Sequence, residues 1–161
     1  RSKADIAIAL DADLLIVDGR VRSIIPLTRR FGLCMPVNGR HLVWRDARSD
    51  CDGGKVADES QGMGMCHCTA FWSFLTQSEC HRALLTRYCL QIRADAKNNN
   101  GARGPLSLWR AIWDSGISPY TLPVQWCVTA SNMGLIGNVI LHVGHEGVAT
   151  QYADLIKEWT P

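Results

Sequence analysis

The sequence predicts an α+β fold, because strand-like, helix-like and again strand-like patterns follow one another along the chain. The first third carries short apolar runs bounded by turn residues. Residues 69–97 then carry apolar side chains at helical spacing. Two further apolar runs, at residues 124–129 and 135–143, predict returning strands. Strands that precede and follow a helical middle are typical of an α+β domain.

The N-terminal part is predicted to be rich in β-structure. The apolar runs 14–17 and 20–25 are separated by the dipeptide Asp18-Gly19, which favours the tight turn of a β-hairpin. Residues 1–48 are therefore expected to form a β-rich extension that precedes the rest of the fold.

The middle of the chain is predicted to be helical after a long surface connection at residues 46–65. The stretch 69–97 exceeds one comfortable helix, and Ser78 is a suitable N-cap for a second helix within it. A short helix is expected over residues 105–114, where proline occupies the first turn. Residues 147–159 fit either a closing helix or a strand followed by a tail.

Composition limits the classes of partner. The chain has 161 residues, 47% of them hydrophobic, and a formal net charge of +2. This length predicts a single domain, residues 1–161, with a sizeable core. The sequence shows neither a basic stripe nor an apolar run of about 18 residues, so we expect a monomer that binds neither nucleic acid nor membrane. The chain begins at Arg1 without a signal peptide, so we expect a processed product or an excised segment.

Cysteine usage is the most unusual feature of the composition. The seven cysteines cannot all pair internally, because their number is odd. Either the domain is secreted and stapled by disulfides with one thiol left over, or it resides in a reducing compartment such as the cytoplasm and keeps its thiols. A chain of this length and hydrophobicity can form a stable core without disulfide bonds, which favours the reducing compartment. The cysteines are then candidates for a nucleophile or for metal ligands.

Cys66 is the first candidate nucleophile. It follows Gly62-Met63-Gly64-Met65 and precedes the predicted helix. Backbone N–H groups and the helix dipole at such a position favour the thiolate, and the glycines allow N–H groups to face a developing oxyanion. The base must come from elsewhere in the fold, and the late histidines His142 and His145 are the candidates.

Zinc is the competing interpretation of the same region. Six possible ligands lie within a short stretch, but they do not form the two matched pairs that structural zinc sites use: Cys66, His67, Cys68, Cys80, His81 and Cys89. His142 and His145 on a strand would face opposite sides, which argues against a shared metal. Asp11, Asp13 and Asp18 are interpreted as solvated residues at strand ends. We therefore expect neither a metal nor another cofactor.

The middle and end of the chain resemble the ovarian tumour (OTU) family of papain-like cysteine proteases, which remove ubiquitin and have viral members. Gly62-Met63-Gly64-Met65-Cys66 is similar to the family's nucleophile motif, and residues 81–85 are similar to the helix that follows. Residues 139–144 and 150–155 resemble the strand pair that carries the catalytic histidine. The resemblance covers residues 60–156 and implies a papain-like fold, with the β-rich extension 1–48 available to hold ubiquitin.

The sequence also departs from the family. Met63 and Met65 replace the Asp and Asn of the nucleophile motif, and Gln151 occupies the column of the catalytic histidine. The papain pattern Cys-x-Ala-Phe offers a second register, at residues 68–71, in which Cys68 is the nucleophile.

The resemblance implies a cysteine protease that acts on ubiquitin or a ubiquitin-like protein, in the host cytoplasm for a viral member. Cys66 is assigned as nucleophile, His145 as base, and the backbone of Gly64 and Met65 as oxyanion donor. Cys68, His142 and Gln151 are the alternates. The two alternative functions are a catalytically degenerate OTU-like module that binds ubiquitin, and a secreted, disulfide-stapled binding protein.

Overall fold

The structure is a computed structural model that describes residues 4–37, 67–97, 104–145 and 147–159. Helices and strands are mixed along the described residues, so the chain has the predicted mixed α+β class. The strands are β1 (Ile6–Leu10), β2 (Leu14–Ile16), β3 (Leu33–Pro36), β4 (Phe71–Leu75), β5 (Tyr120–Leu122) and β6 (Ile140–His142). The α-helices are α1 (Ile24–Phe31), α3 (Glu79–Lys97), α4 (Gly104–Ser115), α5 (Val148–Gln151) and α6 (Ala153–Trp159). Three 3-10 helices complete the described elements: η1 (Gly19–Ser23), η3 (Val124–Trp126) and η4 (Ala130–Asn132).

Two sheets organise these elements. The larger sheet has the order β1-β4-β3-β5, in which β4 pairs antiparallel with β1 and β3, and β5 pairs parallel with β3. The smaller sheet is the antiparallel pair β2-β6. Only three residues, 11–13, connect β1 with β2, so the chain passes directly from one sheet to the other.

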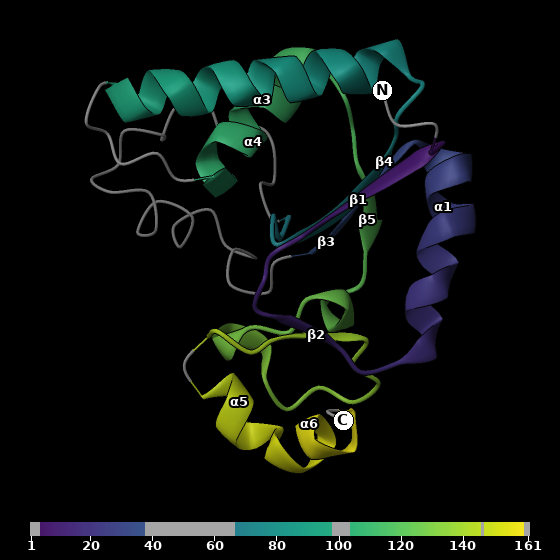
Figure 1. Ribbon diagram of the computed structural model, residues 1–161, viewed down its shortest axis with the longest axis vertical. Coiled ribbons are helices and arrows are strands. Elements are labelled where there is room, and N and C mark those ends of the chain that lie inside the picture. The colour runs from purple at the N-terminus through teal and green to yellow at the C-terminus, as the bar shows by residue number, and fades with distance from the viewer. Residues whose placement is uncertain (1–3, 38–66, 98–103, 146, 160–161) are drawn as a thin grey trace.

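Helices cover both faces of the larger sheet. In Figure 1, α3 and α4 lie on one side of the sheet and α1 lies on the other. Alternation of side chains along β3 explains the two cores, because Leu33 and Met35 face α3 and α4, whereas Cys34 packs with Ile24 of α1. α5 and α6 lie at the opposite end of the molecule from α3, beside the smaller sheet (Figure 1).

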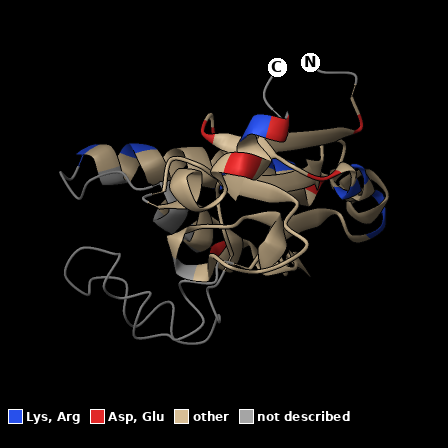
Figure 2. Cartoon of the chain, turned by 90° about the horizontal axis from the view of Figure 1, so that it is seen from below, with Lys and Arg blue, Asp and Glu red and all other residues tan. Residues whose placement is uncertain are grey.

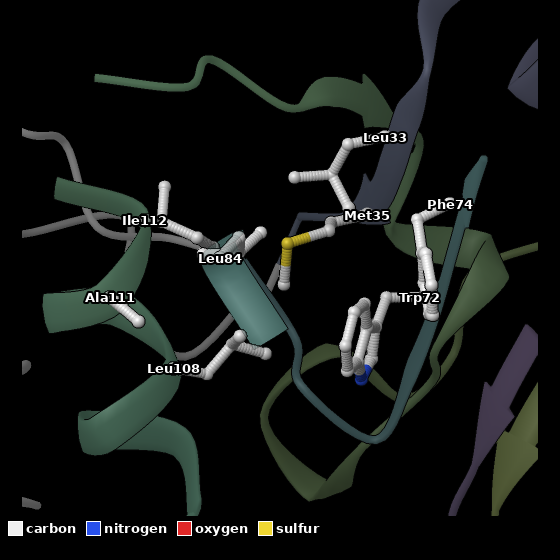
Figure 3. Packing of buried hydrophobic residues seen from close by; sticks show 8 residues of the cluster. All are labelled: Leu33, Met35, Trp72, Phe74, Leu84, Leu108, Ala111 and Ile112. Atoms are coloured by element: carbon white, nitrogen blue, oxygen red, sulfur yellow. The ribbon is translucent and has the colours of Figure 1, made fainter. Parts of the chain in front are cut away.

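The core under α3 and α4 is continuous. Figure 3 shows Leu84 of α3 and Ile112 of α4 pointing toward Met35 and Trp72 of the sheet. Leu84 and Met35 are fully buried, and Trp72 stacks on Phe74 with ring centroids 5.2 Å apart. This core holds β3 and β4 in place, and these strands lead directly into the candidate site.

The predicted N-terminal hairpin is only half correct. Residues 14–16 form β2 as predicted, but the second run forms η1 and α1 instead of a strand. The Asp18 carboxylate accepts a 2.7 Å hydrogen bond from the Arg20 backbone N–H, so the expected turn residue caps a helix. The N-terminal segment also supplies β1 and β3 to the same sheet as β4 and β5, rather than a separate β-rich extension.

The helix predicted to begin at Thr69 is wrong over its first part. Residues 71–75 form β4, which lies inside the larger sheet and is buried along almost its whole length. A short apolar run of this kind fits a buried strand as well as a helix, and tertiary pairing decides between them. The prediction for Ser78 is confirmed, because α3 begins at the next residue and the Ser78 hydroxyl accepts a 3.5 Å hydrogen bond from the His81 N–H.

The later elements agree in part with the prediction. α4 matches the predicted helix 105–114, and residues 147–159 prove helical. The predicted strand 124–129 begins instead as η3, and the predicted strand 135–143 shortens to β6. The predicted connection 46–65 lies outside the described residues.

Charged residues are distributed over separate elements. Figure 2 shows the basic residues of α1 and those of α3 on opposite sides of the view, with acidic residues between them. Among the residues that the structure describes, no helix combines the length and the apolar character needed to cross a bilayer.

Replacement of Leu84 by alanine tests the α3 core. Leu84 is 0% exposed, so Leu84→Ala should lower the free energy of unfolding by about 2–5 kcal/mol through lost burial and a residual cavity. Leu90→Ala is the matched control, because Leu90 lies on the same helix and is 58% exposed, and it should cost less than about 0.5 kcal/mol. Urea unfolding of both variants measures the difference, and equal losses would contradict the packing described.

Candidate active site

The candidate site lies where the two sheets meet. Four segments supply its side chains: Asp13 from the connection between β1 and β2, Cys68 from the extended segment before β4, Cys127 from the residue after η3, and His142 from the end of β6. Donor atoms of Cys68, Cys127 and His142 all lie within 4.8 Å of one another. Asp11 and Asp13 also place carboxylate oxygens within 4.8 Å of a His142 ring nitrogen, so the cluster combines two thiols, an imidazole and two carboxylates.

β6 is the element that gathers these groups. On one side it pairs with β2 in a register that places Leu14 opposite His142, and the Val143 N–H donates to the Asp13 carbonyl at 2.9 Å. On the other side, the His142 N–H donates to the Val128 carbonyl at 2.9 Å. Asp13 and Cys127 are chain neighbours of these partners, so backbone pairing brings both toward His142.

Cys68 is fixed by the larger sheet. Its N–H donates to the Pro36 carbonyl at the end of β3, at 2.8 Å. The preceding carbonyl, of His67, accepts a 3.1 Å hydrogen bond from the Trp109 indole N–H of α4. Cys68 is 4% exposed and packs with Ala70 and Cys127. Its sulfur is therefore held by ordered backbone on both sides.

Asp13 and His142 form an ion pair. Asp13 Oδ1 lies 3.1 Å from His142 Nε2, and the His142 side chain is 12% exposed. The pKa of His142 is raised, chiefly by its interaction with the Cys68 sulfur; burial opposes this rise, and the charges of Asp13 and Asp11 add smaller upward contributions. The imidazolium form is thus stabilised by acidic groups on two sides.

The Cys68 thiol is acidic. Its pKa is lowered to about 6, first by a hydrogen bond with Cys127 and then by interactions with His142 and the Ala70 N–H, although burial opposes the charge. The pKa of Cys127 is raised, because the adjacent Cys68 sulfur and burial both disfavour a second thiolate. The opposite directions of the two pKa shifts favour Cys68 as the sulfur of the pair that ionises first.

His145 lies beside His142. The two rings meet edge to face with centroids 4.3 Å apart, and the His145 N–H donates to the His142 carbonyl at 3.1 Å. The expectation that these rings face opposite sides is wrong, because β6 ends at His142 and the following turn reverses the chain. His145 does not belong to the group of donor atoms around Cys68.

Gly144 makes room for the Asp13 carboxylate. A Cβ atom at position 144 would lie 1.9 Å from Asp13 Oδ2 and 2.8 Å from its Cγ. Any side chain here would therefore displace the carboxylate from His142.

The other predicted site residues are not brought to this cluster. Cys66, Gly64 and Met65 lie outside the described residues. Gln151 is exposed on α5, with its amide directed toward Gly134. Of the proposed zinc ligands, His67 hydrogen bonds Thr121 Oγ1 at 3.1 Å, whereas Cys80 and Cys89 are exposed on α3.

The donor set of Cys68, Cys127 and His142 is of a kind that binds zinc. Two thiolates on one tetrahedral zinc ion lie about 3.8 Å apart, given Zn–S bonds of about 2.3 Å. The two sulfurs here are only 2.7 Å apart. This spacing suits chemistry between the sulfurs better than shared coordination of a metal.

The sequence interpretation missed Asp13 and Cys127. Asp13 was assigned to a solvated strand end, and its side chain is indeed 46% exposed, yet it pairs with His142. Cys127 receives no role in the sequence analysis. Neither residue carries a local motif, and only the register of β2 with β6 and the Val128 bridge to β6 reveal their roles.

The described cysteines are all free: Cys34, Cys68, Cys80, Cys89 and Cys127. No protein-family model matches the chain, and no curated protein matches it in sequence.

Gly144→Ala tests the steric link to Asp13. The new methyl group should turn the Asp13 side chain away, which removes a negative charge from His142 and lowers the pKa of that imidazole. Stability should change by less than about 1 kcal/mol, because the displaced group is the end of a flexible side chain. NMR titration of the His142 ring measures the shift.

Gly19→Ala is the matched control, since a Cβ there meets nothing within 4 Å. An unchanged His142 titration in Gly144→Ala would contradict the described contact.

The pH dependence of Cys68 alkylation tests the acidic thiol. The thiolate forms as pH rises through the Cys68 pKa, so the rate with iodoacetamide should reach half its plateau at about pH 6. His142→Ala should move this midpoint upward, because it removes a cation and hydrogen-bond partner. Peptide mass spectrometry across a pH series follows the rate, with the exposed Cys80 as internal reference. A midpoint near the ordinary value of 9.0 would contradict the assignment.

Proposed function

We propose that this chain is a papain-like cysteine protease in which Cys68 is the nucleophile, His142 the general acid and base, and Asp13 the group that orients the imidazole. One observation carries the proposal: the His142 imidazole lies 3.1 Å from the Asp13 carboxylate through its Nε2, and one of its ring nitrogens lies within 4.8 Å of the Cys68 sulfur. A thiol, an imidazole and an orienting acceptor in this order are the minimal apparatus for acyl transfer by cysteine.

The reaction follows from the protonation states. The Cys68 thiolate attacks the carbonyl carbon of the scissile amide, and the protonated His142 delivers its proton to the leaving amine. The resulting neutral imidazole then activates a water molecule, which hydrolyses the thioester and releases Cys68. Asp13 stabilises the imidazolium in each half of the cycle.

The proposal assigns Cys68 rather than Cys66 as the nucleophile. The Cys66 assignment relied on a helix N-terminus to stabilise the thiolate, but β4 rather than a helix follows this segment. At Cys68 the same stabilisation comes from the Cys127 thiol, His142 and the Ala70 N–H. Similarly, His142 rather than His145 contacts the nucleophile, and Gln151 does not take the place of a base.

The oxyanion donors remain those expected from the glycine-containing turn. The Cys68 N–H already donates to the Pro36 carbonyl at 2.8 Å, so it is occupied. The proposal therefore keeps the backbone N–H groups of Gly64 and Met65 as donors, a pair that lies outside the described residues.

Ubiquitin or a ubiquitin-like protein is the proposed substrate, and a reducing cytoplasm the proposed location. The similarity of residues 60–156 to the OTU family supports the substrate, and the free cysteines of the described part support the compartment. Because α3 and α4 cover one face of the larger sheet and α1 the other, the substrate tail is expected to approach at the junction of the two sheets.

Labelling with ubiquitin that carries a C-terminal electrophile tests nucleophile and substrate together. Wild type should form a covalent adduct, and Cys68→Ala should form none, because the attacking sulfur is removed. His142→Ala should slow labelling at least about 100-fold and Asp13→Asn at least about tenfold. Gel shift and peptide mapping measure rate and position.

Cys80→Ala is the matched control and should label like wild type, because Cys80 is exposed on α3. Loss of the adduct in Cys66→Ala but not in Cys68→Ala would overturn the register. Binding of ubiquitin without any adduct would replace the protease by the degenerate binding module. Failure of ubiquitin with successful labelling by a small peptide electrophile would remove only the substrate assignment.

A further inference from the structure

Cys127 neither attacks the substrate nor transfers a proton in the proposed reaction, and its sulfur lies against that of the proposed nucleophile. Its sulfur lies 2.7 Å from the Cys68 sulfur, although the two residues are 59 positions apart in sequence. Cys127 is 0% exposed and Cys68 4% exposed, so bulk solvent does not separate them. A disulfide bond is about 2.05 Å long, and the sulfurs therefore need to approach by well under 1 Å to form one.

The positions of both residues are fixed by backbone hydrogen bonds. The Cys68 N–H donates to Pro36 at 2.8 Å, and the Cys127 N–H donates to the Val124 carbonyl at 3.0 Å. The next residue, Val128, pairs with β6 through its N–H, at 3.0 Å from the Ile140 carbonyl. The close approach of the sulfurs thus comes from two ordered segments and not from the end of a mobile side chain.

We propose that Cys68 and Cys127 form a reversible redox pair, in which Cys127 captures oxidised Cys68 as a disulfide. Peroxide is the oxidant: the Cys68 thiolate attacks one oxygen, the O–O bond breaks, and Cys68 becomes a sulfenic acid while a water molecule leaves after protonation. The Cys127 sulfur then attacks the Cys68 sulfur, the S–O bond breaks, and the departing hydroxide takes the Cys127 proton as water. A dithiol reductant reverses the change by thiol–disulfide exchange and is itself oxidised.

The pairing has two consequences for the site. The disulfide occupies the sulfur that would attack substrate, so the oxidised protein is inactive until reduced. Capture at the sulfenic stage also prevents further oxidation of Cys68 to sulfinic and sulfonic acids, which dithiols do not reverse. The bond itself does not depend on the proposed protease function, and only its effect on activity rests on that function.

Peroxide treatment followed by mass spectrometry tests the pair without any activity assay. Wild type should lose about 2 Da, and fragmentation should join the peptide of Cys68 to that of Cys127. Dithiothreitol should restore the original mass. In Cys127→Ser, the Cys68 peptide should instead gain two or three oxygens, about tenfold more than in wild type at equal dose, and dithiothreitol should not remove them.

Cys89→Ser is the matched control, because Cys89 is exposed on α3, and it should behave like wild type. Cys127→Ala repeats the test with a side chain without polar atoms, and a circular dichroism melt of each variant verifies folding. A disulfide that involves Cys66 instead of Cys68, or equal irreversible oxidation with and without Cys127, would overturn the pair.

Zinc that co-purifies with the untreated protein and leaves with Cys127→Ser would also overturn the pair in favour of shared coordination. Electrophilic ubiquitin applied before and after peroxide separates the two proposals. A disulfide with no labelling in either state would support the redox pair and contradict the ubiquitin protease. Labelling without a disulfide would support the ubiquitin protease and contradict the redox pair.

Discussion

The antiparallel pairing of β2 with β6 is the constraint on which the candidate site depends. It places Leu14 opposite His142 and thereby brings the Asp13 carboxylate to the imidazole. A shift of this register by one residue would turn His142 to the other face of the strand and separate it from Cys68. Because β2 follows β1 after residues 11–13, the same connection also ties the smaller sheet to the larger one, where Cys68 is anchored.

The groups that stabilise the Cys68 thiolate differ from the helix N-terminus that the sequence predicts. A helix N-terminus stabilises a thiolate through backbone dipoles, and in the sequence this effect favours Cys66. The structure places a strand after the motif, so the stabilising groups are instead the Cys127 thiol, His142 and the Ala70 N–H. These donors come from different segments, which makes the acidity of Cys68 a property of the tertiary structure.

The sequence was informative where local patterns decide the outcome. α4, the start of α3 after Ser78 and the strand β2 follow from proline, capping and apolar periodicity, and the structure contains all three. It was misleading where long-range pairing decides. The apolar run at 71–75 became a strand only because β1 and β3 flank it, and Asp18 capped η1 instead of turning a hairpin. The candidate site depends on long-range pairing, since no local motif marks Asp13 or Cys127.

The acidic surroundings of His142 explain why a nearly buried ion pair is tolerable there. Removing a thiolate and an imidazolium from water is costly, and partners must offset that cost. The Cys68 sulfur shares a hydrogen bond with Cys127 and interacts with the Ala70 N–H, and His142 lies beside the charge of Asp13, which remains half-exposed. Gly144 is part of this balance, because only a residue without Cβ leaves the carboxylate room to reach the imidazole. The charged pair is therefore stabilised at both ends by neighbouring polar groups.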